Sequence, residues 1–474
     1  METPFFGDWS DDFKRNAQRL TQLSRSSLHQ LQLLCAAWIP AHRLTQADEG
    51  AFSRDRLWPF QLTFLSFLWQ TLHAGSSCRD AVRSAAALAH SQNRPAPGDD
   101  TAAFCSARAK LPLERLDEIQ ADLIRDAENH IRQGDLWCDL RVRAVDGTCF
   151  SMPDTDANQK AFPQPSVQKP GCGFPIGKLL AFFCLSTAMI THWATGTWYQ
   201  HELSLLPQLL DQLARGEVML GDRGFGNFPV LAQCLKRGIH GVFRANTAKR
   251  IIDFRRGKSL GKHDRLVSWK KGLVCPRYLT QSEWDLLPDT IEVRVVKVQT
   301  RVKGFRTKSV ILVTTLLDPV KYPPIELARL YLRRWRMELT FRDIKSTLQM
   351  DVLGCKTPEM VARELRMHLL SHNLLRRIGL EACLRHNASL ERISFAGTRS
   401  AVLSFGDALL RTSTQKHRRA LLDEMYRRIA EDLVPLRPGR REPRAVKRRP
   451  KPYPLLTCHR RKYQEIPHRN RYRR

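Results

Sequence analysis

The spacing of apolar and polar residues divides the chain into helical and strand-like stretches. Apolar residues recur at helical spacing within residues 20–39 and 113–131, so we expect helices over most of residues 10–134. From residue 139 the apolar residues alternate or form short runs, and this pattern predicts three successive strands before residue 200. Helical segments therefore precede a region that is rich in strands.

Beyond residue 200 the two patterns alternate. A helix, a strand, a helix and a strand are predicted between residues 202 and 246, so strands come first and β-α-β units follow. Short strands and turns dominate after residue 246, and we expect helix to resume near Pro324 and persist to about Glu431. This order predicts an α/β fold.

These patterns define the expected organisation of the chain. The predicted regions are a helical N-terminal DNA-binding region (1–134), the first part of an α/β core (135–246), a β-rich segment (247–320), a core helix (321–350), a helical C-terminal region (351–436) and a basic, disordered tail (437–474).

The N-terminal region contains a candidate DNA reader. Two short helical segments flank the polar loop at residues 93–100, and they bear Arg79, Arg83, Arg108 and Lys110. Such a pair of helices is compatible with a helix-turn-helix-like motif, in which one helix enters the major groove. A plain helical bundle explains the same pattern equally well.

The charge of the chain changes the picture, because 77 Lys and Arg residues stand against 47 Asp and Glu residues, a net charge of +30. A field of this size attracts polyanions, so we expect nucleic acid as the partner. Residues 437–474 hold 15 Lys and Arg residues against 2 acids. The rest of the chain is therefore also basic.

Several other classes of protein are excluded by the residue pattern. The 12 cysteines are scattered without a C-x-x-C pair, which is typical of free thiols in a reducing cytosol. His368 and His372 lie four residues apart but lack the glutamate of a zincin, so we expect no zinc there. The N-terminus is acidic where a signal peptide is basic, and the apolar run at 179–190 is too short to span a bilayer, so we expect a cytoplasmic protein without a membrane segment.

One predicted helix carries a notable polar stripe. Tyr331, Arg334, Glu338 and Lys345 stand at offsets of 0, 3, 7 and 14 residues. At about 100° per residue in an α-helix these offsets fall at about 0°, 300°, 340° and 320°, so the four side chains share one face. A carboxylate among cations suits a site that holds a metal ion and a phosphate backbone. A solvated helix face with ordinary charge pairs is the alternative.

Two aspartates are predicted at the ends of strands. Asp146 ends the strand-like run RVRAVD before Gly147, and Asp222 ends the run VMLGD. Each alone is compatible with turn chemistry, since Asp-Gly is a frequent turn dipeptide. Together with Glu338 on a basic surface, however, they match the requirement for two-metal phosphoryl transfer, because converging carboxylates repel one another unless cations lie between them.

With these residues in place, the chain resembles the DDE transposases of bacterial insertion sequences, specifically the insertion sequence four group. That group has the signature Y-x2-R-x3-E-x6-K, which Tyr331, Arg334, Glu338 and Lys345 satisfy. The runs AVDGTCFSMPDTDAN and LGDRGF are similar to its first and second aspartate motifs. The three motifs occur in the order of the family, across about residues 139–350.

The resemblance implies a ribonuclease-H-like core in which Asp146, Asp222 and Glu338 form the catalytic triad and bind two Mg²⁺ or Mn²⁺ ions. It also implies that the β-rich segment from about 247 to 320 is an insertion into that core. By the same resemblance, Tyr331, Arg334 and Lys345 contact phosphates of the transposon end, and Arg244 in the run VFRAN lies near the DNA end.

The family is expected to move DNA by cut-and-paste, often through a hairpin intermediate that an extruded base helps to form. An extruded base needs an aromatic platform. Trp269, which lies among lysines, is the candidate for this role, and Trp284 lies in a more acidic setting.

The leading hypothesis is a transposase that binds terminal inverted repeats, cuts the element ends and joins them to target DNA. A homodimer in the DNA complex is expected from the family. A catalytically silent DNA-binding relative or an inhibitor of transposition is the alternative, and it would have no need for the three acids. A basic RNA-binding or ribosome-associated protein would explain the tail but not the acids.

Overall fold

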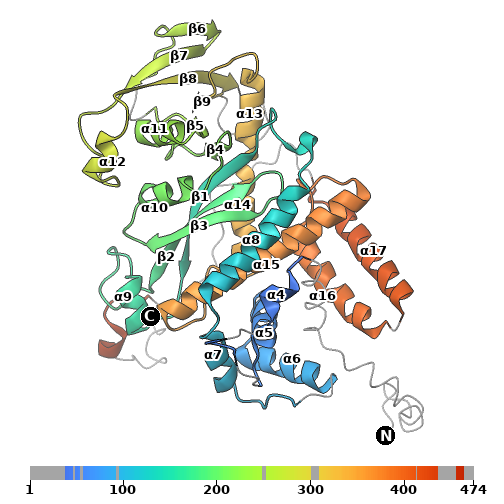
Figure 1. The fold of residues 1–474 in the computed structure, drawn as a ribbon. Coiled ribbons are helices and arrows are strands. Elements are labelled where there is room, and N and C mark those ends of the chain that lie inside the picture. Colours follow the sequence, from blue (N-terminus) through green and yellow to red (C-terminus); the bar gives the residue numbers. More distant parts are fainter. Residues whose placement is uncertain are drawn as a thin grey trace, which may run out of the picture.

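The computed structural model of the chain describes residues 38–45, 49–53, 57–91, 95–247, 252–299, 309–412, 414–435 and 455–463 (Figure 1). Residues 20–37 of the helix expected over residues 20–39, and most of the tail from residue 437, lie outside these residues. Within them the fold is mixed α/β, as predicted: one large sheet packs against helices, and a body of helices lies beside it.

Nine strands of the described residues form one sheet in the order β3-β2-β1-β4-β5-β9-β8-β7-β6. The strands are β1 (Val142–Ser151), β2 (Ile176–Cys184), β3 (Ile190–Thr197), β4 (Val218–Gly221), β5 (His240–Arg244), β6 (Lys258–Gly261), β7 (Asp264–Lys270), β8 (Thr290–Gln299) and β9 (Ser309–Thr314). β1 is antiparallel to β2 and parallel to β4, and β4 is parallel to β5.

The predicted order of strands and helices between residues 139 and 246 is confirmed. After β1, β2 and β3 come helix α10 (Glu202–Leu210), β4, helix α11 (Phe228–Lys236) and β5. The short helix α9 (Asp156–Ala161) between β1 and β2 was not predicted. Its start is fixed by the Thr155 side chain, which accepts a hydrogen bond from the Asn158 backbone N–H.

The apolar run in β2 is explained by burial on both faces of the sheet. Residues 179–184 are all buried. Alternate side chains enter different cores: Leu179 and Phe183 join the core on one face, and Leu180 and Phe182 join the core on the other. A strand covered on both faces reads as a continuous apolar run, because both of its faces lack contact with water.

The β-rich segment extends the same sheet. β9 pairs antiparallel with β5, with Val242 opposite Thr314, and β8, β7 and β6 follow as an antiparallel series. The segment also contains the short helix α12 (Gln281–Asp285). Its strands cover the edge of β5, which would otherwise expose unpaired backbone groups.

The helix expected from Pro324 onward is more segmented than predicted. Helix α13 (Pro324–Arg333) and helix α14 (Trp335–Arg342) meet at Arg334, and a π-helical turn, Asp343–Thr347, follows. Helices α15 (Pro358–His386), α16 (Phe395–Arg411) and α17 (Gln415–Glu431) complete this part. Asn387 ends α15 in the left-handed conformation with φ of 49°.

Helix α15 is the centre of the helical body (Figure 1). The N-terminal helices are α4 (Ala41–Leu44), α5 (Phe60–Leu72), α6 (Cys78–Ser91), α7 (Ala102–Arg108) and α8 (Leu113–Asn129). Phe64 of α5, Leu123 of α8, Leu374 of α15 and Met425 of α17 belong to one hydrophobic core. The N-terminal helices and α17 therefore share a core around α15.

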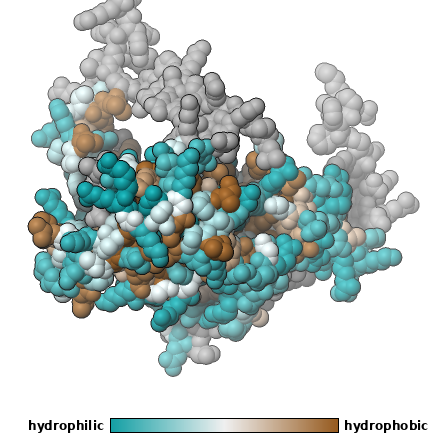
Figure 2. All heavy atoms as spheres, turned by 90° about the horizontal axis from the view of Figure 1, so that it is seen from above, coloured by the Kyte–Doolittle hydropathy of each residue, from teal (hydrophilic) through white to brown (hydrophobic). Residues whose placement is uncertain are grey.

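The surface is mostly hydrophilic on the face seen from above, with hydrophobic residues scattered between polar ones (Figure 2). No helix among the described residues is both long and apolar enough to cross a bilayer.

Candidate active site

The register of the sheet brings Asp146 and Asp222 to neighbouring positions. β1 and β4 are parallel, and Ala144 lies opposite Leu220. Asp146 comes two residues after Ala144, and Asp222 comes two residues after Leu220. The carboxyl ends of adjacent parallel strands meet at one edge of a sheet, where side chains are free to converge on a substrate.

One detail of the prediction is wrong, because β1 does not end at Asp146. It continues to Ser151 and remains paired with β2, where Asp146 lies opposite Ala181. Only the pairing of β1 with the four-residue strand β4 stops at Ala144. Asp146 is therefore held by a continuous strand on one side and faces the end of β4 on the other.

Backbone donors orient both aspartates. Asp146 Oδ1 accepts a hydrogen bond from the backbone N–H of Gly147 at 3.0 Å. Asp222 Oδ1 accepts one from the backbone N–H of Gly224 at 2.6 Å, which closes a tight turn after β4. Asp222 directly follows β4, which ends at Gly221, one residue earlier than predicted.

Asp146 lies in an electrostatically unfavourable place for a carboxylate. Burial raises its pKa to about 6, and the charges of Asp222 and Glu202 act in the same direction. The Gly147 N–H and the guanidinium of Arg334 lower the pKa only in part. The site therefore holds several acids that are close enough to influence one another.

Glu202 is an acid of this site that the sequence analysis missed. It is the first residue of α10, and its carboxylate lies over Gly147: a Cβ atom at Gly147 would stand 2.2 Å from Glu202 Oε1. Burial and the charge of Asp222 raise the pKa of Glu202. An acid in the first turn of a helix is common because it complements the helix dipole, so no pattern in the sequence distinguishes this residue.

Glu338 forms an ion pair with Arg334. Arg334 Nη2 donates a hydrogen bond to Glu338 Oε1 at 3.1 Å, and the positive charge of Arg334 also acts on Asp146. Glu338 lies on α14, which packs against β1. Among the residues that the structure describes, no group of three Asp, Glu, His or Cys side chains is arranged to hold a metal ion. Arg334 thus lies between the acid of the helix and an acid of the sheet.

The predicted helical stripe is only partly retained. Arg334 keeps helical backbone angles, but its N–H and that of Met337 bond to carbonyls three residues earlier, which tightens the helix locally. The Arg334 guanidinium lies 5.9 Å from the centre of the Tyr331 ring. The structure therefore brings Tyr331, Arg334 and Glu338 together despite the break between α13 and α14.

Tyr331 also links the helix to β5. Its side chain is buried, and burial raises its pKa, while the charges of Arg334 and Arg244 act to lower it and that of Asp222 acts to raise it. Arg244 is the last residue of β5 and is half-buried. Arg244 therefore belongs to the same neighbourhood as the acids.

Lys345 lies in the π-helical turn, where the angular spacing of an α-helix no longer applies. Burial raises the pKa of Cys149, and the positive charges of Lys178 and Lys345 act in the opposite direction. Cys149 lies on β1, three residues beyond Asp146. Lys345 is thus close to the part of β1 that follows Asp146.

The two tryptophans that were candidates for a base platform are buried. Trp269 is 7% exposed and Trp284 is 5% exposed, and both belong to a hydrophobic core. An exposed aromatic ring lies elsewhere: Trp335, the first residue of α14, is 52% exposed and follows Arg334 directly.

The candidate DNA reader of the N-terminal region is also modified by the structure. Arg79, Arg83 and Lys110 are exposed on or beside α6 and α7. Arg108 is buried, donates a hydrogen bond to Gln70 and lies against an aromatic ring at 4.7 Å. Arg108 is therefore a structural residue, because its guanidinium is already bound within the fold.

Comparison with known proteins shows the family of the chain. Residues 137–374 match the family model described as the transposase DDE domain. The chain is 30% identical over 369 residues to the transposase InsG for insertion sequence element IS4 of Escherichia coli (strain K12), an alignment that covers 74% of this chain and 77% of that protein.

A solved structure gives a weaker similarity. The cryo-EM structure of a piggyBac transposase synaptic complex with hairpin DNA aligns with 82% of this chain and 81% of its own, at 10% identity and a TM-score of 0.40. The sequence similarities alone are sufficient to assign the family. The chain belongs to the DDE-domain transposases, in the insertion sequence four group, and its function is the transposition of DNA.

Proposed function

We propose that this transposase binds the terminal inverted repeats of its element, cuts the DNA at the element ends and joins the freed 3′-hydroxyls to target DNA by cut-and-paste. Asp146, Asp222 and Glu338 are the catalytic acids. The observation that carries this proposal is the register of β1 and β4, which puts the two aspartates side by side while α14, with Glu338, packs against β1.

The sheet order supports a ribonuclease-H-like core. β3, β2 and β1 form an antiparallel series, and β1, β4 and β5 are parallel neighbours connected through α10 and α11. In this interpretation β6 to β9 are an insertion that widens the sheet beyond β5.

The donor chemistry fits two Mg²⁺ or Mn²⁺ ions, because carboxylate oxygens are the ligands that these hard cations prefer. The buried carboxylate of Asp146, beside Asp222 and Glu202, also favours a cation on electrostatic grounds. When bound, such ions activate the attacking oxygen and stabilise the leaving oxygen of a phosphodiester. Asp146 and Asp222 would hold such ions, and Glu338 would join them if Arg334 released it.

The cations around the acids are suited to DNA phosphates. Arg334 and Arg244 lie beside Tyr331, and Lys345 lies beside β1, so three positive groups and a phenol surround the acids. A guanidinium binds phosphate with charge-assisted hydrogen bonds. A DNA phosphate that attracts Arg334 would release Glu338 toward the aspartates, so binding of the DNA end completes the set of acids. Trp335 offers an exposed ring on which a base can stack.

We further expect two copies of the chain in the DNA complex, because the two ends of an element must be cut together. A catalytically silent DNA-binding relative is disfavoured, since such a protein would not need Asp146, Asp222 and Glu338 around one basic site.

The proposal is tested by incubating the full chain with a labelled duplex that carries the element end, in the presence of Mg²⁺. We expect the unmodified chain to cleave the end and Asp146→Asn to bind it without cleavage. Glu326→Gln is the matched control, because Glu326 pairs with Arg329 on α13 and is not among the acids of the site. Equal cleavage by the unmodified chain and Asp146→Asn, or no cleavage by either despite tight binding, would overturn the assignment.

A further inference from the structure

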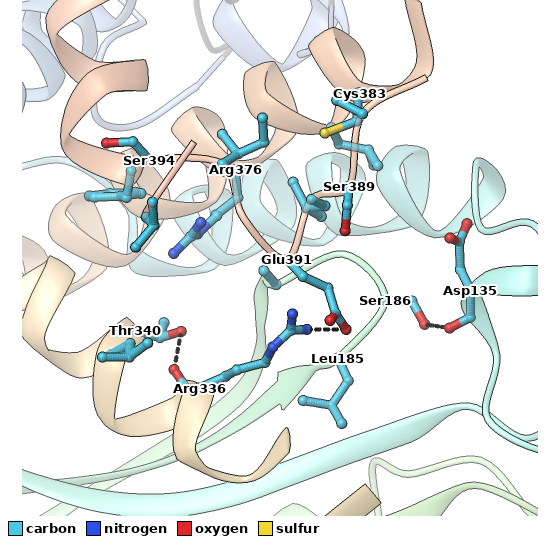
Figure 3. A pocket seen from close by; sticks show the side chains of 18 of the residues that line it. Asp135, Leu185, Ser186, Arg336, Thr340, Arg376, Cys383, Ser389, Glu391 and Ser394 are labelled. Atoms are coloured by element: carbon cyan, nitrogen blue, oxygen red, sulfur yellow. Dashed lines mark hydrogen bonds and ion pairs between the residues drawn. The ribbon is translucent and has the colours of Figure 1, made fainter. Parts of the chain in front are cut away.

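A second charged site lies on the far face of the helix that carries Glu338. A cavity of about 610 Å³ is bounded by α14, by α15 and by the turn that leads into α16 (Figure 3). Arg336 and Thr340 of α14 line it. Each stands two residues from Glu338, which is about 200° around a helix, so these two side chains leave α14 on the face opposite Glu338. Arg342, about 40° from Glu338 around the helix, also lines the cavity.

The cavity has an excess of positive charge, and we call it the arginine pocket. Five arginines and three acids line it: Arg132, Arg333, Arg336, Arg342, Arg376, Asp135, Asp343 and Glu391. Two positive charges are therefore not matched by acids within the lining.

The ion pairs locate the excess charge. Glu391 is shared by Arg333 at 3.1 Å and Arg336 at 2.6 Å. Asp343 is shared by Arg376 at 2.9 Å and Arg342 at 3.8 Å. A carboxylate carries one negative charge, so each shared acid leaves one guanidinium charge without compensation.

The unmatched charge is partly buried. Burial lowers the pKa of Arg336 to about 10; Glu391 acts to raise that pKa, and the neighbouring charges of Arg333 and Arg376 lower it further. Arg333 Nε is buried and has no hydrogen-bond partner. Figure 3 shows Arg336 and Glu391 pointing toward each other, with Arg376 pointing from α15 toward the helix of Arg336. Buried guanidinium groups without full compensation favour binding of an anion.

Part of the remaining lining is apolar, and the other part is polar, with Ser389 and Asn387 among its residues. Leu339, Leu380, Leu390 and Phe395 form parts of the wall. A pocket of this volume is in the range of small-molecule sites, and an apolar wall beside guanidinium groups matches a ligand with a flat ring and a phosphate.

We propose that the arginine pocket binds a nucleotide unit, with its phosphate on Arg336 and Arg342 and its base against the leucine wall. Two sources share this chemistry: a free nucleotide, and a nucleotide within a DNA strand. The proposal goes beyond the cutting and joining of DNA and does not depend on it. Because Arg336 and Glu338 share α14, a ligand in the pocket contacts the helix that positions the catalytic glutamate.

The test measures binding of ATP and of inorganic tripolyphosphate to the full chain by calorimetry, without metal or DNA. Arg342→Gln should weaken binding about tenfold, the usual effect of losing a charge-assisted hydrogen bond. Glu391→Gln should tighten binding at least about threefold, because it removes the acid that competes for Arg333 and Arg336. The side chains of Arg342 and Glu391 are 62% and 47% exposed, so neither change opens the core.

Arg329→Gln is the matched control, because it removes an exposed arginine from α13 outside the pocket. It corrects for non-specific attraction to a chain of net charge +30.

A duplex of 20 base pairs, added as a competitor, distinguishes the two sources. If the duplex displaces tripolyphosphate from the unmodified chain but not from Arg342→Gln, the site is assigned to a DNA strand. If ATP binds and the duplex does not displace it, the site is assigned to a free nucleotide. Equal weakening by Arg342→Gln and Arg329→Gln, or no tightening by Glu391→Gln, would overturn the proposal. Because no cleavage is measured, failure here is separate from failure of the catalytic proposal.

Discussion

Arg334 donates a hydrogen bond to Glu338 at 3.1 Å while its charge also acts on Asp146. The guanidinium therefore lies between the acid of the helix and an acid of the sheet, where a bound cation would compete with it. Arg334 and a metal ion are alternative partners for the same carboxylate, because both satisfy its negative charge.

Replacing Arg334 should therefore separate metal binding from cleavage. In Arg334→Gln, Glu338 loses its partner, and the affinity for Mn²⁺ without DNA should rise about two- to fivefold, as expected for loss of a partly exposed ion pair. Cleavage of element-end DNA should fall, because a phosphate ligand is lost. Titration followed by the electron spin resonance of free Mn²⁺ measures the first effect. Arg329→Gln is the control, and unchanged Mn²⁺ affinity in Arg334→Gln would contradict the competition.

Gly147 should be required for the position of Glu202 rather than for folding. A Cβ atom there would lie 2.2 Å from Glu202 Oε1, the flexible end of a side chain, so Gly147→Ala should move that carboxylate. We expect a change in unfolding free energy of less than about 1 kcal/mol and a clear loss of end cleavage. Thermal unfolding and the cleavage assay measure the two effects.

Gly226→Ala is the informative comparison for Gly147→Ala. Its Cβ would lie 2.3 Å from the backbone oxygen of Arg244, which cannot rotate away. This variant should lose about 1–3 kcal/mol of stability, the usual cost of a forced backbone shift. Equal stability losses in the two variants would contradict the assigned role of Gly147.

The link between the β-rich segment and the catalytic helix should depend on Asp264. Arg294 is fully buried, donates to both oxygens of Asp264 at 2.9 and 2.6 Å, and also donates to the carbonyl of Tyr322, just before α13. Asp264→Ala leaves a buried guanidinium without its acid and should cost about 3–5 kcal/mol. Chemical denaturation measures this loss.

The matched control for Asp264→Ala is Asp253→Ala, because Asp253 pairs with the exposed Arg255 and its loss should leave the stability nearly unchanged. A similar small loss for Asp264→Ala would show that the buried pair does not hold the segment in place.

The strands of the core were predictable because their burial leaves a direct trace in the sequence. β2 is apolar at every position of 179–184, since it faces a core on each side, and Asp222 follows a short apolar strand that ends at Gly221. The tightening at Arg334 was not predictable, because this residue keeps helical backbone angles and only its hydrogen-bond pattern changes.

Contacts between distant elements account for the other differences. Glu202 reads as an ordinary acid of a first helical turn until the fold lays it over Gly147. Trp269 lies beside lysines in the sequence, but alternation along β7 turns its side chain inward while Lys270 stays exposed. Arg108 was expected in a DNA reader, but its side chain is buried against the rings of Phe67 and Phe104. Tertiary packing decided each of these positions.

Buried histidines of α15 should make the protein less stable in mild acid. Burial lowers the pKa of His368 to about 4, and His372 is also lowered well below its ordinary value of 6.5. The unfolded chain then binds more protons than the folded one between about pH 6.5 and pH 4, so stability is greatest above this window and falls as pH decreases through it. His368 alone should account for up to about 3 kcal/mol of this loss at pH 4.

His368→Phe removes the titrating group, so denaturation at several pH values should give a flatter profile of stability against pH than for the unmodified chain. His386→Phe, at an exposed histidine at the end of the same helix, is the matched control. An unchanged pH profile in His368→Phe would place the acid sensitivity elsewhere in the fold.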